Sequence, residues 1–275
     1  MAESRSNADR ARRSSLPHER FARYPLCMRL LLSLLGAASL STSAFATEDS
    51  CAELVRAKSA QLERSAVMKL QMQVQAYRFT RMLVDPLSKD PKFGPTWREG
   101  NPHWDQAFAV LQPDVLAHLS AAGTLELRHI EKNLPGRLQA KACADHLALL
   151  RTPHGATADR LNNAAAMDSF LTSVEKQFPT PARLAPFRQK AREEVDADMG
   201  LADGPEVKRD AALHRKAREQ LRAFDASYVA ASKTLGDARG KEEQQASRQF
   251  GAELMKRHEL RLVAIMRAFL DAKPK

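Results

Sequence analysis

The 275-residue chain lacks the motifs that would assign it to a common chemical class. It has three cysteines, no Gly-x-Ser-x-Gly nucleophile motif, no P-loop and no dinucleotide-binding glycine run. The His-Glu-x-x-His and Cys-x-x-Cys-His spacings are also missing. The alternation of β-branched and polar residues that is typical of strands is absent as well. No motif with a known mechanism therefore points to an enzyme, although a helical hydrolase with one buried glutamate would leave no such trace.

Long hydrophobic runs are confined to the beginning of the chain. No apolar stretch after Ala46 approaches the roughly 20 residues that a membrane helix needs. The segment Met28–Ala46 has one arginine, a leucine-rich run and small residues ending in Ala44-Phe45-Ala46. This order is typical of a secretory signal peptide, so we expect cleavage after Ala46 and a periplasmic or secreted protein. A retained membrane anchor is the alternative.

The arginine-rich residues before Met28 are either a long start of the signal peptide or an extension ahead of a true start at Met28. Residues 1–46 carry seven Lys/Arg and three Asp/Glu, so their removal lowers the formal net charge from +10 to +6. Basic and acidic residues are interspersed in the remainder, a pattern typical of solvated helix faces. Because the protein is expected to act outside the cytoplasm, we expect no nucleic-acid partner despite the positive net charge.

Cysteine usage fits an exported protein. Cys27 precedes the expected cleavage point, which leaves Cys51 and Cys143 in an oxidising compartment. We expect these two residues to form a disulfide. Two buried free thiols are the alternative.

The composition after Ala46 predicts an all-α fold, a multi-helix bundle. Ala, Leu, Arg, Glu, Gln and Lys dominate, and proline and glycine fall where helices would end. We expect residues 47–200 to form the bundle. Its first helix is predicted from Asp49-Ser50 to Val84, and a second helix is predicted to begin at Asn101-Pro102. Further boundaries are expected at Pro113, Gly123, Thr124 and Asn133.

Residues 201–275 are expected to add a long antiparallel helical hairpin that packs on the bundle or extends it. Val207, His214, Leu221, Tyr228 and Leu235 form a seven-residue repeat, and Gly236–Gly240 is predicted to be the turn. This turn would place His214 and His258 within a turn or two of each other. Two imidazoles without an obvious third ligand are more typical of core packing, so we predict no metal and no cofactor.

Residues 147–161, LALLRTPHGATADRL, contain a helix end followed by Thr152-Pro153-x-Gly155. This stretch resembles a family of small exported bacterial helical proteins, catalogued as domain of unknown function 2059. Those proteins carry signal peptides and a (Ser/Thr)-Pro-x-Gly turn after a helix, although an aromatic residue usually precedes the turn where Leu150 and Arg151 stand here. The resemblance covers about residues 110–170. It implies an exported all-helical protein and no active-site residues.

The segment Pro86–Trp104 is the one long irregular stretch. It holds both tryptophans of the chain, and long ordered loops often carry function. Two interpretations stay open, a ligand-binding loop and a proline-stiffened lid whose rings dock on the bundle. The binding-loop candidates are Phe93, Trp97, His103 and Trp104.

We interpret the chain as an exported, non-enzymatic helical protein that binds other proteins or envelope components, with chaperone-like holding of exported chains as one version. Methionine-containing helix faces support this interpretation, because methionine adapts to varied apolar partners; they include Met68, Met72, Met82, Met255 and Met266. Ordinary core packing is the alternative explanation, and it is expected to account for most of these methionines. The alternative is a cell-envelope hydrolase that uses a carboxylate near Trp97 and Trp104, with Glu99 or Asp105 as the first suspects.

Overall fold

The computed structural model describes residues 48–177 and 182–272, and the predicted signal peptide and Cys27 lie outside this part of the chain. Every regular element in the described part is helical, so the all-α prediction is confirmed. The α-helices are α2 (Glu48–Arg64), α3 (Ala66–Val84), α4 (Pro102–Asn133), α5 (Ala140–Leu150), α6 (Pro153–Gln177), α7 (Ala185–Met199), α8 (Pro205–Arg209), α9 (Ala211–Arg257) and α10 (Glu259–Asp271). Short 3₁₀ turns connect them: η2 (Asp85–Lys89), η3 (Gly94–Thr96), η4 (Pro135–Arg137), η5 (Ala182–Leu184) and η6 (Gly200–Asp203).

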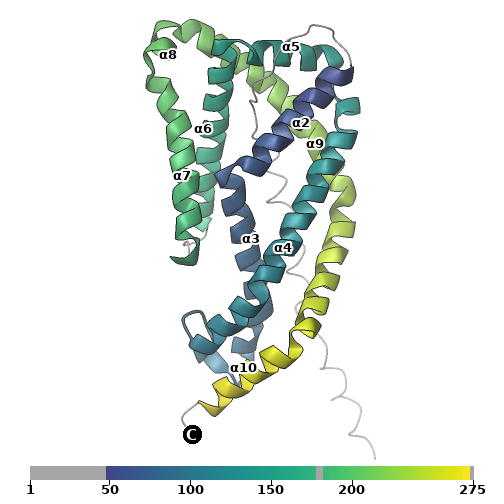
Figure 1. Cartoon of the computed structure of the whole chain (residues 1–275), viewed down its shortest axis with the longest axis vertical. Coiled ribbons are helices and arrows are strands. Elements are labelled where there is room, and N and C mark those ends of the chain that lie inside the picture. The colour runs from purple at the N-terminus through teal and green to yellow at the C-terminus, as the bar shows by residue number, and fades with distance from the viewer. Residues whose placement is uncertain (1–47, 178–181, 273–275) are drawn as a thin grey trace, which may run out of the picture.

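The molecule is elongated, with most helices gathered at one end (Figure 1). Helices α2, α5, α6, α7 and α8 lie there together with the first half of α9. From this end α3, α4 and the second half of α9 run along the long axis, and α10 crosses them at the opposite end, next to the C-terminus. Buried apolar side chains from both ends of the molecule, such as Leu54 of α2 and Phe269 of α10, belong to one continuous cluster, so both ends share a core.

A break at Ser65 divides the expected first helix into α2 and α3. The Ser65 hydroxyl accepts a hydrogen bond from the backbone N–H of Val67 and donates one to Oε1 of Glu194 at 2.8 Å. The other oxygen of Glu194, on α7, accepts the backbone N–H of Ala66 at 2.7 Å. A carboxylate at the first turn satisfies N–H groups that have no helical partner and complements the helix dipole. This long-range cap explains why one continuous helix to Val84 was the wrong prediction.

Helix α4 begins where the sequence predicts and continues past two expected boundaries. The side chain of Asn101 accepts the N–H of His103 at 3.0 Å, with Pro102 at the first helical position. Pro113 and Gly123 lie inside the helix, which runs unbroken to Asn133. A proline forfeits one helical hydrogen bond, and packing of this long helix against α3, α9 and α10 offsets that loss.

The predicted C-terminal hairpin is wrong. Gly236 and Gly240 lie within the single 47-residue helix α9, and the chain next changes direction at His258, between α9 and α10. Each glycine costs a helix interior only about 1 kcal/mol relative to alanine. Leu235 and Leu254 are buried on either side of the expected turn, so both halves of α9 gain from packing, which favours one continuous helix.

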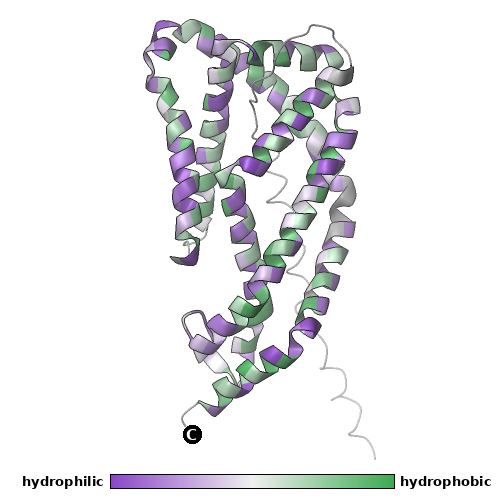
Figure 2. Cartoon of the chain, viewed as in Figure 1, coloured by the Kyte–Doolittle hydropathy of each residue, from purple (hydrophilic) through white to green (hydrophobic). Residues whose placement is uncertain are grey.

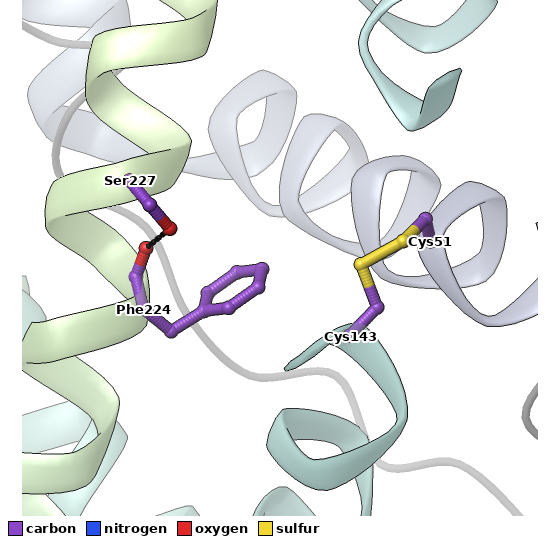
Figure 3. Close-up of a disulfide and its surroundings, with 4 residues drawn as sticks. All are labelled: Cys51, Cys143, Phe224 and Ser227. Carbon is purple, nitrogen blue, oxygen red and sulfur yellow. Dashed lines mark hydrogen bonds between the residues drawn. A yellow bond between two sulfur atoms is a disulfide. The ribbon is translucent and has the colours of Figure 1, made fainter. Parts of the chain in front are cut away.

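The disulfide prediction is confirmed. Cys51 of α2 and Cys143 of α5 are joined across 92 positions of sequence. In Figure 3 the ring of Phe224, from α9, lies on the side of its helix that faces this bond. The bridge therefore ties the beginning of the described chain to α5 beside the core packing of α9.

Polar and apolar residues are interspersed around the helices rather than collected into one uniformly apolar helix (Figure 2). Within residues 48–177 and 182–272, no helix combines the length and the apolar composition needed to cross a bilayer.

Candidate functional site

The aromatic residues of the predicted binding loop lie mostly in the core. Phe93, Trp97 and Trp104 are 6%, 1% and 0% exposed, and His103 is half-buried. The Phe93 and Trp97 rings pack on Phe269 of α10, with centroid distances of 5.6 and 5.1 Å. These rings are covered by protein, so the geometry favours the docking interpretation of this loop.

Both indole N–H groups of the predicted binding segment have partners inside the fold, although Trp104 belongs to the first turn of α4. Trp97 Nε1 donates to the carbonyl oxygen of Val84, and Trp104 Nε1 donates to Oδ1 of Asp85, each at 3.0 Å. A buried indole normally needs such an acceptor. Trp97 therefore fastens the loop, and Trp104 the first turn of α4, to the end of α3.

The carboxylates suspected in the hydrolase alternative are bound to one guanidinium. Arg183 Nη2 lies 2.9 Å from Oδ1 of Asp105 and 3.6 Å from Oε1 of Glu99. Tyr77 donates its hydroxyl hydrogen to Oε2 of Glu99 at 2.5 Å, and burial together with this hydrogen bond raises the pKa of Tyr77 to about 12. The Arg183 guanidinium also lies 4.4 Å from the ring centroid of Phe108. This arrangement connects η5 to α3 and α4.

An apolar groove opens where the α2–α3 bend faces α4. We call it the methionine groove; its volume is about 310 Å³ and its apolar wall includes Leu62, Met68, Met72 and Leu127. Glu63 and Lys69 stand at the same opening and are exposed. The groove lies beside the break at Ser65, where α2 and α3 run in different directions (Figure 1).

A second feature is a buried polar cluster between α2, α5, α6 and α9. Lys58 is 2% exposed, and its Nζ contacts Oδ1 of Asp225 at 2.9 Å. Asp159 is fully buried and accepts a hydrogen bond from Asn163 on Oδ2, while its Oδ1 has no hydrogen-bond partner in the described chain. His146, 4% exposed, likewise has an unpartnered Nε2. Buried charge and unpaired polar atoms are costly, so the rest of the fold must offset the cost of this cluster.

Burial controls how this cluster ionises. Desolvation raises the pKa of Asp159 to about 7 although the nearby Lys58 lowers it. Desolvation, followed by the positive charge of Lys58, lowers the pKa of His146 to about 3. Near neutral pH the imidazole is therefore neutral, and Asp159 is close to the midpoint of its titration.

Sequence reasoning missed this cluster, although one signal was present. Lys58 lies three residues after Val55 and four before Leu62, so it occupies the apolar face of α2. A lysine on the apolar face of a helix needs a buried partner. The sequence does not show that the partner is Asp225, because 167 residues separate the two.

The two histidines expected to lie together are far apart. His214 lies 44 residues before His258, which is about 66 Å of rise along a straight α-helix. The ring of His214 instead lies 4.9 Å from that of His154, and His258 Nε2 contacts Oδ2 of Asp114 at 3.0 Å. In the part of the chain that the structure describes, no group of three or more His, Cys, Asp or Glu side chains is arranged to hold a metal ion.

Comparison of the chain with protein-family models, curated proteins and solved structures found no match.

Proposed function

We propose that this chain is an exported, non-enzymatic protein that binds apolar segments of non-native polypeptides through the methionine groove. The observation that carries the proposal is an open, largely apolar hollow with Met68 and Met72 in its wall. Methionine is unbranched and polarisable, so one groove lined by it accepts apolar side chains of different shapes. This property suits a binder of varied exported chains.

The size and rim of the groove favour a flexible segment over a folded partner. A volume of about 310 Å³ accommodates a few side chains, at the small end of binding pockets. Glu63 and Lys69 place charges of both signs at the opening of the groove. The position of a bound segment along the groove therefore decides whether its flanking charged residues are attracted or repelled. Binding of this kind is adaptable and only moderately selective.

The experiment uses a reduced, carboxymethylated protein as a permanently unfolded client, with fluorescence anisotropy as the readout. Met72 is half-exposed in the groove, so Met72→Glu is expected to keep the fold and weaken client binding about tenfold or more. Met199→Glu is the matched control, because Met199 is 40% exposed on α7 and outside the groove. Equal binding by both variants, or no binding of the unfolded client, would contradict the proposal.

Export and the absence of catalysis are tested separately. Intact mass measurement of protein purified from the cell envelope is expected to show a chain that begins at Thr47. Incubation with dye-labelled cell wall is expected to release no dye. Release that is abolished by Glu99→Gln would support the hydrolase alternative instead.

A further inference from the structure

A pocket of about 300 Å³ lies between α6 and α9, on the outer side of the buried polar cluster. We call it the α6–α9 pocket. Its polar lining comprises Asn162 and Asn163 from α6 and Arg222 and Asp225 from α9. The asparagines are 8% and 5% exposed, so they form a fixed polar floor, whereas Arg222 is exposed at the rim. The pocket is distinct from the methionine groove and shares no residue with it.

Two opposite charges line this pocket without meeting each other. Arg222 and Asp225 are three residues apart on α9, a spacing at which ion pairs commonly form. Among the described residues, however, Asp225 has its ion pair with Lys58, which approaches Oδ1 from the buried side. The guanidinium of Arg222 and the second oxygen of Asp225 are therefore both left for a ligand in the pocket.

The asparagine floor is already held in place by the fold. Asn162 accepts a hydrogen bond from Arg218 Nε at 3.0 Å and donates one to the backbone carbonyl of Arg218 at 3.1 Å. Asn163 donates to Oδ2 of Asp159 at 3.0 Å. Polar groups fixed in this way cost little entropy when a ligand binds, because they are already ordered.

The remaining lining consists of small apolar side chains, which include Ala165, Ala166, Ala226 and Val229. These residues leave a volume at the lower limit for small-molecule pockets, so the ligand is of metabolite size. A guanidinium pairs with a carboxylate and a carboxylate with an ammonium group, while the alanines and the valine accept an aliphatic chain. We propose that the α6–α9 pocket binds a free α-amino acid with an apolar side chain, its carboxylate on Arg222 and its ammonium group on Asp225. This inference does not depend on the proposed function.

The test is a ligand-observed NMR titration with three probes that differ by one charge each. L-Leucine carries both charges, L-leucinamide lacks the carboxylate, and 4-methylpentanoate lacks the ammonium group. The full protein is expected to bind leucine with a Kd of about 1 mM or tighter, and each analogue about tenfold more weakly. No leucine binding at about 10 mM, or equal binding of leucine and 4-methylpentanoate, would overturn the proposal.

Substitutions of residues that line the α6–α9 pocket test whether leucine binds there. Arg222→Gln removes the exposed guanidinium and is expected to weaken leucine binding about tenfold, while Arg215→Gln, an exposed arginine of α9 outside the pocket, serves as the matched control. Ala166→Leu fills the pocket and is expected to abolish binding by steric exclusion. If Arg222→Gln and Ala166→Leu both bind leucine like the unmodified protein, the ligand binds elsewhere and the proposal fails.

Discussion

Lys58 Nζ lies 2.9 Å from Oδ1 of Asp225, and the lysine is almost completely buried. The ammonium group also lies 5.4 Å from the ring centroid of Tyr228, one turn along α9. This pair joins α2 to α9 across 167 positions of sequence. Charge buried in this way needs its partner, because an unpaired charge in the interior carries a large desolvation penalty.

Removal of the Lys58 charge is expected to destabilise the protein strongly. Lys58→Met leaves Asp225 without its cation and should lower the free energy of unfolding by about 3 kcal/mol. The double variant Lys58→Met/Asp225→Leu should recover most of this loss, since both charges are then absent. Urea denaturation followed by circular dichroism measures both effects.

The matched control is an exposed pair with nearly the same separation. Lys141 Nζ contacts Oδ2 of Asp145 at 3.0 Å, with side chains that are 86% and 68% exposed. Lys141→Met should change the free energy of unfolding by about 0.5 kcal/mol or less. Similar losses for Lys58→Met and Lys141→Met would show that burial does not determine the strength of the first pair.

Asp159 and His146 are expected to contribute opposite pH dependences to stability. The pKa of Asp159 is raised from 3.8 to about 7, so between these values the folded state binds more protons and stability falls as the pH rises. The pKa of His146 is lowered from 6.5 to about 3, so in that window the folded state binds fewer protons and stability rises with pH. From about pH 4 to about pH 6.5 the two contributions cancel.

Single substitutions should reveal each contribution. Relative to the unmodified protein, Asp159→Asn removes the falling component and makes the stability rise more steeply with pH, by up to about 1.4 kcal/mol per pH unit. His146→Gln should shift the slope by a similar amount in the opposite direction. Urea denaturation at several values from about pH 4 to about pH 6.5 provides the slopes. Slopes that coincide for all three proteins would contradict the ionisation states derived from burial.

The sequence predicted features that depend on neighbouring residues and missed features that depend on distant ones. Asn101-Pro102 begins α4 as expected, because a cap and a proline at the first helical position act locally. The break at Ser65 depends on Glu194, which is 129 positions away. The disulfide was predictable for a different reason, since only two cysteines follow the expected signal peptide.

The candidate sites show the same contrast between features that depend on neighbouring residues and features that depend on distant ones. Met68 and Met72 were predicted to contribute to an adaptable face, and both lie in the methionine groove. The part that α4 plays in that groove could not be predicted, because Gly123 was expected to end a helix and instead lies within α4, in the groove wall. Asp225 likewise gave no signal, since one aspartate on a helix rich in charged residues is normally solvated.

Gly155 is expected to tolerate no larger side chain. A Cβ atom at this position would lie 1.8 Å from the carbonyl oxygen of Leu149, and the Gly155 N–H donates to Thr152 Oγ1 at 3.0 Å. Gly155→Ala should therefore lower the free energy of unfolding by about 3 kcal/mol, because backbone on both sides of the turn must shift. Gly136→Ala is the control, since a Cβ there meets no atom within 4 Å. Equal thermal unfolding of the two variants would contradict the close approach at Gly155.

Loss of the Cys51–Cys143 bond is expected to lower stability by about 2–5 kcal/mol, because the bond closes a long loop in the unfolded chain. For a chain of this size the midpoint of thermal unfolding should fall by about 5–15 °C on reduction. The double variant Cys51→Ala/Cys143→Ala should melt at a lower temperature than the native, disulfide-bonded protein. Addition of reductant should not change the melting temperature of this variant. An unchanged melt of the native protein, together with two titratable thiols, would contradict the disulfide.

Helix α9 is expected to continue without a break through Gly236 and Gly240. The distance between two labelled positions on either side of these glycines tests this expectation. Glu219 and Glu253 are exposed and lie on opposite sides of these glycines, so spin labels on cysteines at both positions report the path of the helix. A continuous helix places the labelled positions about 50 Å apart, at 1.5 Å per residue, whereas a hairpin would bring them within about 20 Å. Double electron–electron resonance separates these values. The longer distance is expected because Leu235 and Leu254 are both buried, and a turn between them would remove one of these side chains from the core.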